Sequence, residues 1–225
     1  MTVGIVVAMD KEVAPFLKGK NAKEIKYGLY TVFNFTLAGK DVYLIRQQTV
    51  GEICSAGATQ ILITKFNVDV VLNFGVVGAL THEISLLSTM AVSSVVHYAM
   101  DTTSFDGHEM GKYSCFDDVA IPCDEKLLEI VHEVQPDMPI VRCASADKFV
   151  DSAEEKQYLN KQFGAEICDM ESAGIVITCA LNNVPCLLIK SVSDSLMGGG
   201  KQYSETVLVA VEQYVSVVEK VLERL

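Results

Sequence analysis

The sequence predicts an α/β protein with a mixed sheet, and three observations lead there. Short apolar runs typical of buried strands alternate with helix-like runs along the chain. Residues 31–37 and 41–46 flank Ala38-Gly39-Lys40, a pattern typical of a β-hairpin, which makes part of the sheet antiparallel. No linker, repeat or low-complexity stretch interrupts residues 1–225, so we expect one domain.

The composition is globular and indicates no polyanionic partner. Half of the 225 residues are hydrophobic and the formal net charge is −11, whereas a nucleic-acid binder normally carries a basic face. The seven cysteines are odd in number and contain no C-x-x-C pair, and the four histidines lack metal-ligand spacing. We therefore expect a reducing compartment, no disulfide framework, no metal and no other cofactor.

The N-terminal half predicts two strands and two helices besides the hairpin. Residues 3–8 form an apolar run that is too short to span a membrane and is followed by charge, which predicts a core strand in a cytoplasmic protein rather than a signal peptide. Pro15 belongs in a first helical turn, so a helix should begin close to residue 12. Residues 52–66 have helical periodicity, and residues 68–74 predict a strand buried on both faces. Residues 75–80 then predict a glycine turn able to present backbone N–H groups to a ligand, or merely tight packing.

The C-terminal half continues the alternation. Residues 90–97 predict a strand, and residues 124–134 predict an amphipathic helix. A helix after Glu171 should end at Val184-Pro185 and lead into a strand over residues 186–192. The last helix has an apolar stripe whose spacing alternates between four and three residues, which favours core packing over a partner helix. The stripe consists of Val207, Val211, Tyr214, Val218, Val221 and Leu225.

Three acidic residues stand at element boundaries and are candidates for chemistry: Glu12, Glu171 and Asp194. Ligands of open α/β sheets collect at strand ends, and a buried carboxylate is costly unless it is paired or used. Glu12 and Glu171 could equally be acids placed favourably at helix N-termini, and Asp194 could be a cap or turn residue. Gly198-Gly199-Gly200 could be an idle loop or a hinge that lets Tyr203 close over a ligand.

Six short segments, taken together and in this order, indicate a protein family, which none of them does alone. They are residues 4–12 (GIVVAMDKE), 73–80 (NFGVVGAL), 101–105 (DTTSF), 145–150 (SADKFV), 169–171 (DME) and 193–194 (SD). In this order the chain resembles the purine and uridine phosphorylase superfamily over nearly its whole length. Within that superfamily it is most similar to the methylthioadenosine/S-adenosylhomocysteine nucleosidases.

The resemblance implies a three-layer α/β/α sandwich with a central mixed, partly barrel-like sheet. It also implies a homodimer that cleaves the N-glycosidic bond of a purine nucleoside with water as acceptor, as a step of methionine salvage. The partner is then a small nucleoside, with neither nucleic acid nor membrane involved.

Carried over by motif, the resemblance assigns catalytic roles to the three acids. Asp194 would donate a proton toward the purine N7, with Ser193 orienting it, and Glu12 would act as base toward the attacking water. Glu171 would bind the ribose hydroxyls together with Met170. These residue types suit the chemistry, since cleavage builds negative charge on the leaving base and positive charge on the sugar.

The resemblance also assigns a lining to the pocket. Phe149 would stack on the base, and the backbone of Val150 would bond its edge. Phe105 would reach into the neighbouring subunit's site, and Tyr203 would lie in a mobile flap. The remaining lining residues are Ala8, Met9, Val50 and Gly78.

Three residues depart from the nucleosidase pattern around the attacking water. Lys190 stands where an arginine is usual, Val76 replaces a serine, and Asp169 is one methylene shorter than the usual glutamate. Lysine keeps the charge of arginine but loses the planar fork. With these changes, Glu12 would have less help from neighbouring residues in holding and activating the water.

Two alternatives remain open from the sequence. A phosphorylase would need cations for phosphate, and Arg46 is the one nearby cation that could serve, whereas the acidic Glu12 would repel phosphate. A catalytically silent nucleoside-binding protein would explain the changes at Val76 and Lys190. The sequence does not fix the base or the 5′ substituent.

Overall fold

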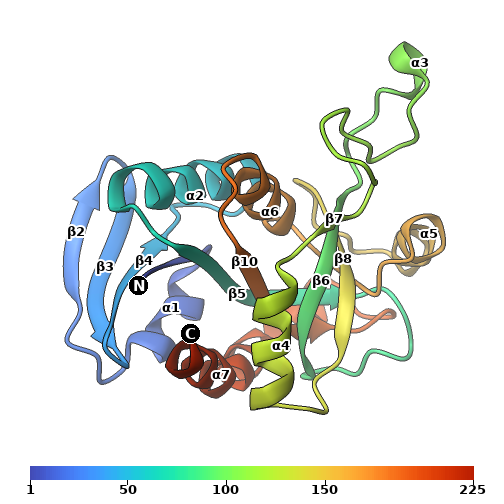
Figure 1. Ribbon diagram of the computed structural model, residues 1–225. Coiled ribbons are helices and arrows are strands. Elements are labelled where there is room, and N and C mark those ends of the chain that lie inside the picture. The colour runs from blue at the N-terminus through green and yellow to red at the C-terminus, as the bar shows by residue number, and fades with distance from the viewer.

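A ten-stranded mixed sheet forms the middle of the molecule in the computed structural model, which describes residues 1–225 (Figure 1). Five strands close into a ring, because β5 pairs with both β10 and β9, β10 pairs with β6, and β8 joins β6 to β9. The strands β1, β4, β3 and β2 extend from β5 as an open wing, and β7 pairs with β6. The predicted mixed, partly barrel-like sheet is therefore confirmed. The strands are β1 (Thr2–Val7), β2 (Lys23–Tyr27), β3 (Tyr30–Leu37), β4 (Lys40–Arg46), β5 (Val70–Ala79), β6 (Thr89–His97), β7 (Ile121–Pro122), β8 (Ile140–Ser145), β9 (Ile167–Asp169) and β10 (Cys186–Asp194).

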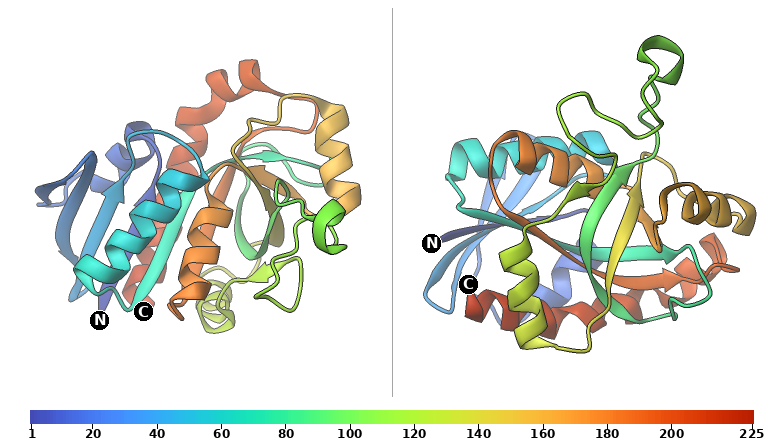
Figure 2. Two further views of the ribbon diagram at one scale, coloured as in Figure 1. Left: turned by 90° about the horizontal axis from the view of Figure 1, so that it is seen from above. Right: turned by 45° about the vertical axis from the view of Figure 1, so that its right-hand side comes forward.

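Helices cover the sheet on both sides and complete the predicted three layers (Figures 1 and 2). On one side, α2 (Glu52–Phe66) packs against α6 (Ser172–Leu181). On the other side, α7 (Gly200–Arg224) contacts both α1 (Asp10–Leu17) and α4 (Glu125–Val134). The helix α5 (Ala153–Phe163) lies against the outside of the ring, where Leu159 and Phe163 join a smaller core.

Three aromatic rings pack β5 against the helices α1 and α7. The Phe74 ring on β5 lies 4.9 Å from the Phe16 ring on α1 and 5.0 Å from the Tyr214 ring on α7, centroid to centroid. All three side chains are fully buried. The long apolar stripe of α7 therefore packs on the core, as its spacing predicts.

The first helix begins earlier than Pro15 suggests. It starts at Asp10, and Met9 is its N-cap, whose N–H donates to the Glu12 carboxylate at 3.0 Å. Residues 10–12 are thereby already helical, so Pro15 lies in the second turn and not in the first. The helix therefore starts close to residue 12, as expected, but the placement of Pro15 in its first turn was wrong.

The expected glycine turn after residue 74 is wrong, because β5 continues through this segment to Ala79. Gly75 pairs with Lys190 of β10, and Gly78 pairs with Cys168 of β9. A Cβ at Gly75 would lie 3.0 Å from Glu12 Oε1, and one at Gly78 would lie 3.0 Å from Asp194 Oδ2. The glycines therefore allow carboxylates to approach a continuous strand rather than making a turn.

The last helix also extends beyond its apolar stripe. It begins at Gly200, so Tyr203, expected in a flap, lies in the first helical turn. Only residues 195–199 separate β10 from α7. They are tied down, since the Ser195 N–H donates to Gln202 Oε1 at 2.7 Å and the Gly200 N–H donates to Asp151 Oδ1 at 2.7 Å.

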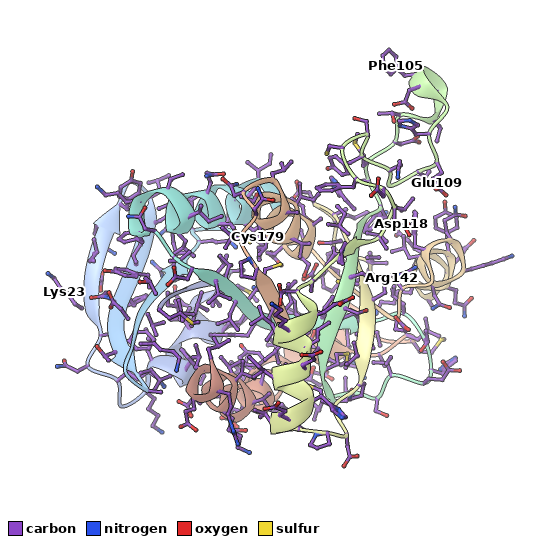
Figure 3. All side chains as sticks on the ribbon, in the orientation of Figure 1. Lys23, Phe105, Glu109, Asp118, Arg142 and Cys179 are labelled. Carbon is purple, nitrogen blue, oxygen red and sulfur yellow. The ribbon has the colours of Figure 1, made fainter.

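An arm between β6 and β7 projects from the body and carries α3 (Thr103–Asp106) (Figures 1 and 3). Phe105 lies at its tip and is 90% exposed. All seven cysteines are free, five of them buried. None of the helices is both long and apolar enough to cross a membrane.

Truncating Phe74 tests the aromatic connection between β5 and the helices. We expect Phe74→Ala to lower the free energy of unfolding by about 3–5 kcal/mol, because a large buried ring is replaced by a cavity. Urea denaturation followed by circular dichroism measures the change. Leu208→Ala, at a site 64% exposed on α7, is the matched control and should change stability by less than about 0.5 kcal/mol. Equal losses in both variants would contradict the assignment.

Candidate active site

A cavity of about 350 Å³ opens where β5, β9 and β10 meet the start of α1. It contains the three acidic residues that stand at element boundaries in the sequence: Glu12, Glu171 and Asp194. Twelve of the sequence-predicted site residues line it, together with two that the sequence did not single out, Val77 and Cys168. The twelve are Met9, Glu12, Val50, Val76, Gly78, Phe149, Asp169, Met170, Glu171, Ser193, Asp194 and Tyr203.

A larger hollow of about 620 Å³ lies elsewhere, between the start of α4 and residues 183–186. Of its charged residues, Glu125 and Lys126 are exposed and Asp124 is half-buried as the N-cap of α4. The smaller cavity is the better candidate for chemistry, because the buried carboxyl groups of Glu12, Asp169 and Asp194 converge there.

Glu12 is fixed by two backbone groups. Its Oε2 accepts from the Met9 N–H at 3.0 Å, and its Oε1 accepts from the Val76 N–H at 3.1 Å. Burial raises the pKa of this carboxyl to about 7, against the opposing effects of these hydrogen bonds and of the Lys190 charge. A carboxyl group with this pKa is suited to accept a proton near neutral pH. The Val76 contact uses the backbone, so the loss of a serine at this position leaves Glu12 held in place.

Glu171 is the N-cap residue of α6, and its Oε1 accepts from the Gly51 N–H at 2.9 Å. Burial, followed by the negative charge of Asp169, raises the pKa of Glu171 to about 8. The neighbouring Met170 lines the same cavity. This part of the site presents a partly satisfied carboxyl group to polar groups of a ligand.

Asp194 ends β10 with both carboxylate oxygens occupied. Ser193 Oγ donates to Oδ1 at 3.0 Å, and Lys156 Nζ donates to Oδ2 at 2.5 Å. A Cβ added at Gly78 would meet Asp194, and one added at Gly75 would meet Glu12; the two glycines are three residues apart, about 10 Å along a strand. The two carboxylates therefore reach β5 at separate points of one cavity.

A buried ionic network lies behind Glu171. Lys190 Nζ donates to Asp169 Oδ2 at 2.7 Å, and Ser145 Oγ donates to Asp169 Oδ1 at 2.6 Å. Burial acts to raise the pKa of Asp169, but the Lys190 charge and these hydrogen bonds hold it below its usual value. The Ser145 hydroxyl has one proton to donate and lies within hydrogen-bond distance of the Glu52 carboxyl as well, whose other oxygen accepts from the Gly174 N–H. Burial and the Asp169 charge raise the pKa of Glu52 to about 7.

Aromatic and apolar side chains form one wall of the cavity. The Phe149 and Tyr203 rings meet edge to face with centroids 5.7 Å apart. The Tyr203 hydroxyl accepts from Lys11 Nζ at 2.7 Å and lies 3.4 Å from Met9 Sδ. Tyr203 therefore connects the start of α7 to the start of α1 across the opening.

Four sequence-predicted residues lie outside this lining. Ala8 lines a neighbouring hollow beside Arg46, and the buried Val150 lines a small hollow behind Phe149. Lys190 is fully buried behind the cavity, where it pairs with Asp169. Phe105 is on the projecting arm, away from the cavity of its own chain (Figure 3).

Two residues important to the site escaped the sequence interpretation. Glu52 follows a glycine at a helix start and resembles any exposed first-turn acid. Lys156 follows two glutamates in a polar helix, a pattern typical of a solvated face. No signal in the sequence distinguishes either one. No group of three or more His, Cys, Asp or Glu side chains is arranged to hold a metal ion.

Comparison with known proteins places this architecture in a family. The model of the phosphorylase superfamily matches residues 2–225, so the chain belongs to this superfamily. The 5′-methylthioadenosine/S-adenosylhomocysteine nucleosidase of Staphylococcus aureus is 31% identical over 213 residues, which cover 92% of each chain. The superfamily and the nucleosidase likeness that the six segments indicated are thereby confirmed.

Solved structures share the fold closely. The futalosine hydrolase of Helicobacter pylori superposes with a TM-score of 0.94 at 24% identity and covers 100% of this chain and 98% of its own. The 5′-methylthioadenosine/S-adenosylhomocysteine nucleosidase of the same organism, with butyl-thio-DADMe-Immucillin-A, superposes with a TM-score of 0.93 at 24% identity, covering 100% and 99%. The predicted nucleoside phosphorylase fold is confirmed.

The raised pKa of Glu171 predicts a loss of stability with rising pH. The pKa of about 8 in the folded state exceeds the ordinary glutamate pKa of 4.5, so the folded protein binds more protons between these pH values. Stability must therefore fall as pH rises through this window, and the full penalty is present above about pH 8. Glu171→Gln removes this titration and keeps an acceptor for Gly51. Urea unfolding at pH 5.0 and 8.5 should show a smaller loss for this variant, by at least about 1 kcal/mol.

The exposed Glu83 supplies the matched control. Glu83→Gln should retain the wild-type dependence of stability on pH. If Glu171→Gln also retains it, Glu171 does not hold its proton in the folded state.

Proposed function

We propose that this protein hydrolyses the N-glycosidic bond of a purine nucleoside, 5′-methylthioadenosine and/or S-adenosylhomocysteine, and releases adenine as a step of methionine salvage. The observation that carries the proposal is the placement of Glu12, Glu171 and Asp194 around one cavity. The relative from Staphylococcus aureus, named for these two substrates, supports the choice of nucleosides.

Glu12 is the general base that activates the attacking water in this proposal. Its carboxylate, with a pKa of about 7, takes a proton from water as the water oxygen bonds to C1′ of the ribose. Glu171 and Met170 hold the ribose hydroxyls, and the nearby carboxylates stabilise the positive charge that develops on the sugar.

Asp194 is the general acid that protonates the leaving purine in this proposal. In the reacting complex Asp194 carries its proton on Oδ1, since Lys156 occupies Oδ2 and the Ser193 hydroxyl can turn to the Val77 carbonyl at 3.2 Å. That proton passes to N7 as the electron pair of the C1′–N9 bond leaves with the purine. Ser193 fixes the orientation of Asp194, because the same hydroxyl donates to Asp194 Oδ1 at 3.0 Å and lies 3.2 Å from the Val77 carbonyl oxygen. Phe149 offers a ring for stacking, and the Val150 backbone lies behind it for the edge of the base.

Water is favoured over phosphate as the acceptor because three of the four cations near the cavity already pair with an acid of the protein. Lys190 pairs with Asp169, and Lys156 pairs with Asp194. Lys11 donates to the Tyr203 hydroxyl. Arg46, the cation that could have served a phosphorylase, pairs with Asp10 and donates to Thr31 at 3.0 Å. Phosphate would meet the Glu12 carboxylate, and of the cations beside the cavity only Lys11 lacks an acidic partner to neutralise its charge.

The proposal includes a homodimer of single-domain subunits in the cytoplasm. Phe105 is 90% exposed at the tip of an arm and lies away from its own cavity, which suits a side chain that completes a neighbour's site. Val50, at the cavity mouth, is 39% exposed and offers it an apolar contact. Seven free cysteines suit a reducing compartment.

Base release without phosphate is the direct test. Purified protein should release adenine from 5′-methylthioadenosine or S-adenosylhomocysteine at the same rate in buffers with and without phosphate, as measured by chromatography of the products. Adenosine, inosine and futalosine-like nucleosides complete the panel. Strict dependence on phosphate would establish a phosphorylase, and binding without release from any nucleoside would establish a silent binding protein.

The acid at the base end has its own test. Asp194→Asn removes the transferable proton at nearly constant shape, so kcat for adenine release should fall about a hundred- to ten-thousandfold. Glu154→Gln, an exposed carboxylate on α5, is the control and should retain the wild-type kcat. An unchanged kcat in Asp194→Asn would refute the role of Asp194.

A further inference from the structure

Lys156 is a fully buried lysine on α5, a helix that the reaction proposed above does not use. Charged lysine is almost never fully buried unless it is paired, because removing the ammonium from water is costly. The three hydrogen-bond acceptors of the Lys156 ammonium group identify its partners.

All three hydrogens of the ammonium group have a partner within the protein. Lys156 Nζ donates to Asp194 Oδ2 at 2.5 Å, to the Ser195 carbonyl at 2.8 Å and to the Gly198 carbonyl at 3.2 Å. No donor is left for a substrate, so any effect of Lys156 on the reaction must pass through these partners.

The two carbonyls belong to the link between β10 and α7. The Gly198 N–H donates to the Ser195 carbonyl at 2.9 Å, so residues 195–198 form a closed turn whose carbonyls converge on the ammonium. This turn leads directly to Tyr203, which packs against Phe149 at the wall of the cavity. One side chain therefore binds the acid and the segment that sets the position of the aromatic wall.

We propose that Lys156 is a positioning residue that holds the Asp194 carboxylate and the turn of residues 195–198 in one arrangement. The inference rests on the proposed function, in which Asp194 delivers the proton to the base. Without the ammonium, the carboxylate loses its partner on Oδ2 and two carbonyls lose their donor. The acid and the turn then move independently, and a misplacement of about 1 Å can cost about a hundredfold in rate.

Lys156→Met tests the proposal, because methionine keeps the length of the side chain and removes its three donors. We expect kcat for adenine release to fall about a hundredfold, with a change in KM of less than about threefold, since the acid acts on the leaving base rather than on binding. Lys156→Arg restores the charge and donors and should recover at least about a tenth of the wild-type kcat. Lys161→Met, an exposed lysine on the same helix, is the control and should retain the wild-type kcat.

Proteolysis near the turn of residues 195–198 gives a measurement that does not depend on catalytic activity. Lys201 is exposed in the first turn of α7, directly after the link. In Lys156→Met, trypsin should cleave after Lys201 at least about tenfold faster than in the wild type, while cleavage after the exposed Lys126 on α4 stays unchanged. Mass spectrometry of the fragments identifies both sites. Equal acceleration at both sites would indicate general destabilisation and overturn the proposal.

The coupling between the two charges gives a second independent readout. Because each single substitution leaves the other group buried without its oppositely charged partner, Asp194→Asn/Lys156→Met should lose less thermal stability than the two single variants together. Additive losses in melting temperature, or a wild-type kcat in Lys156→Met, would overturn the proposal. If the wild-type protein releases no base, the proposed function fails, and the trypsin and melting measurements still decide whether Lys156 holds Asp194 and the turn.

Discussion

Carboxyl groups withdrawn from water need replacement donors, and this constraint governs the architecture around the cavity. Glu12 finds its donors in the backbone at the start of α1 and on β5. Asp169 and Asp194 find theirs in buried lysines contributed by β10 and α5. Each carboxylate is thereby tied to a different part of the fold, so the positions of the helices and the geometry of the site depend on each other.

The way each carboxylate is held sets its chemistry. Backbone N–H groups fix Glu12 without fully offsetting its burial, so its pKa rises to about 7. A lysine partner instead holds the pKa of Asp169 below its usual value and keeps that carboxylate charged behind Glu171. Glu12 and Asp169 thus differ in protonation, because Glu12 accepts hydrogen bonds from neutral backbone N–H groups, whereas Asp169 pairs with the positive charge of Lys190.

Much of the fold follows from the sequence, because apolar periodicity and the hairpin reflect burial directly. The hairpin of β3 and β4, the buried strand β10 and the apolar stripe of α7 are examples. Two local errors have physical causes: Gly75 signals a close approach rather than a turn, and the Met9 cap starts α1 before Pro15 can mark the beginning. The acids of the site stand out at element boundaries, and the family resemblance gave them roles. Lys156 and Glu52 could not be found in this way, since only the packing of α5 and α2 against the ring turns ordinary helix charges into buried partners.

The glycines of β5 have a consequence for attempts to stabilise this protein. Glycine weakens a strand interior, so β-propensity alone recommends replacing Gly75 and Gly78 with branched residues. Their missing side chains are the space that Glu12 and Asp194 occupy, and even one methyl group at either position would press on a carboxylate oxygen at 3.0 Å. A substitution chosen from β-propensity alone would therefore displace a buried carboxylate, so the preference of the strand and the geometry of the site make opposite demands at these two positions.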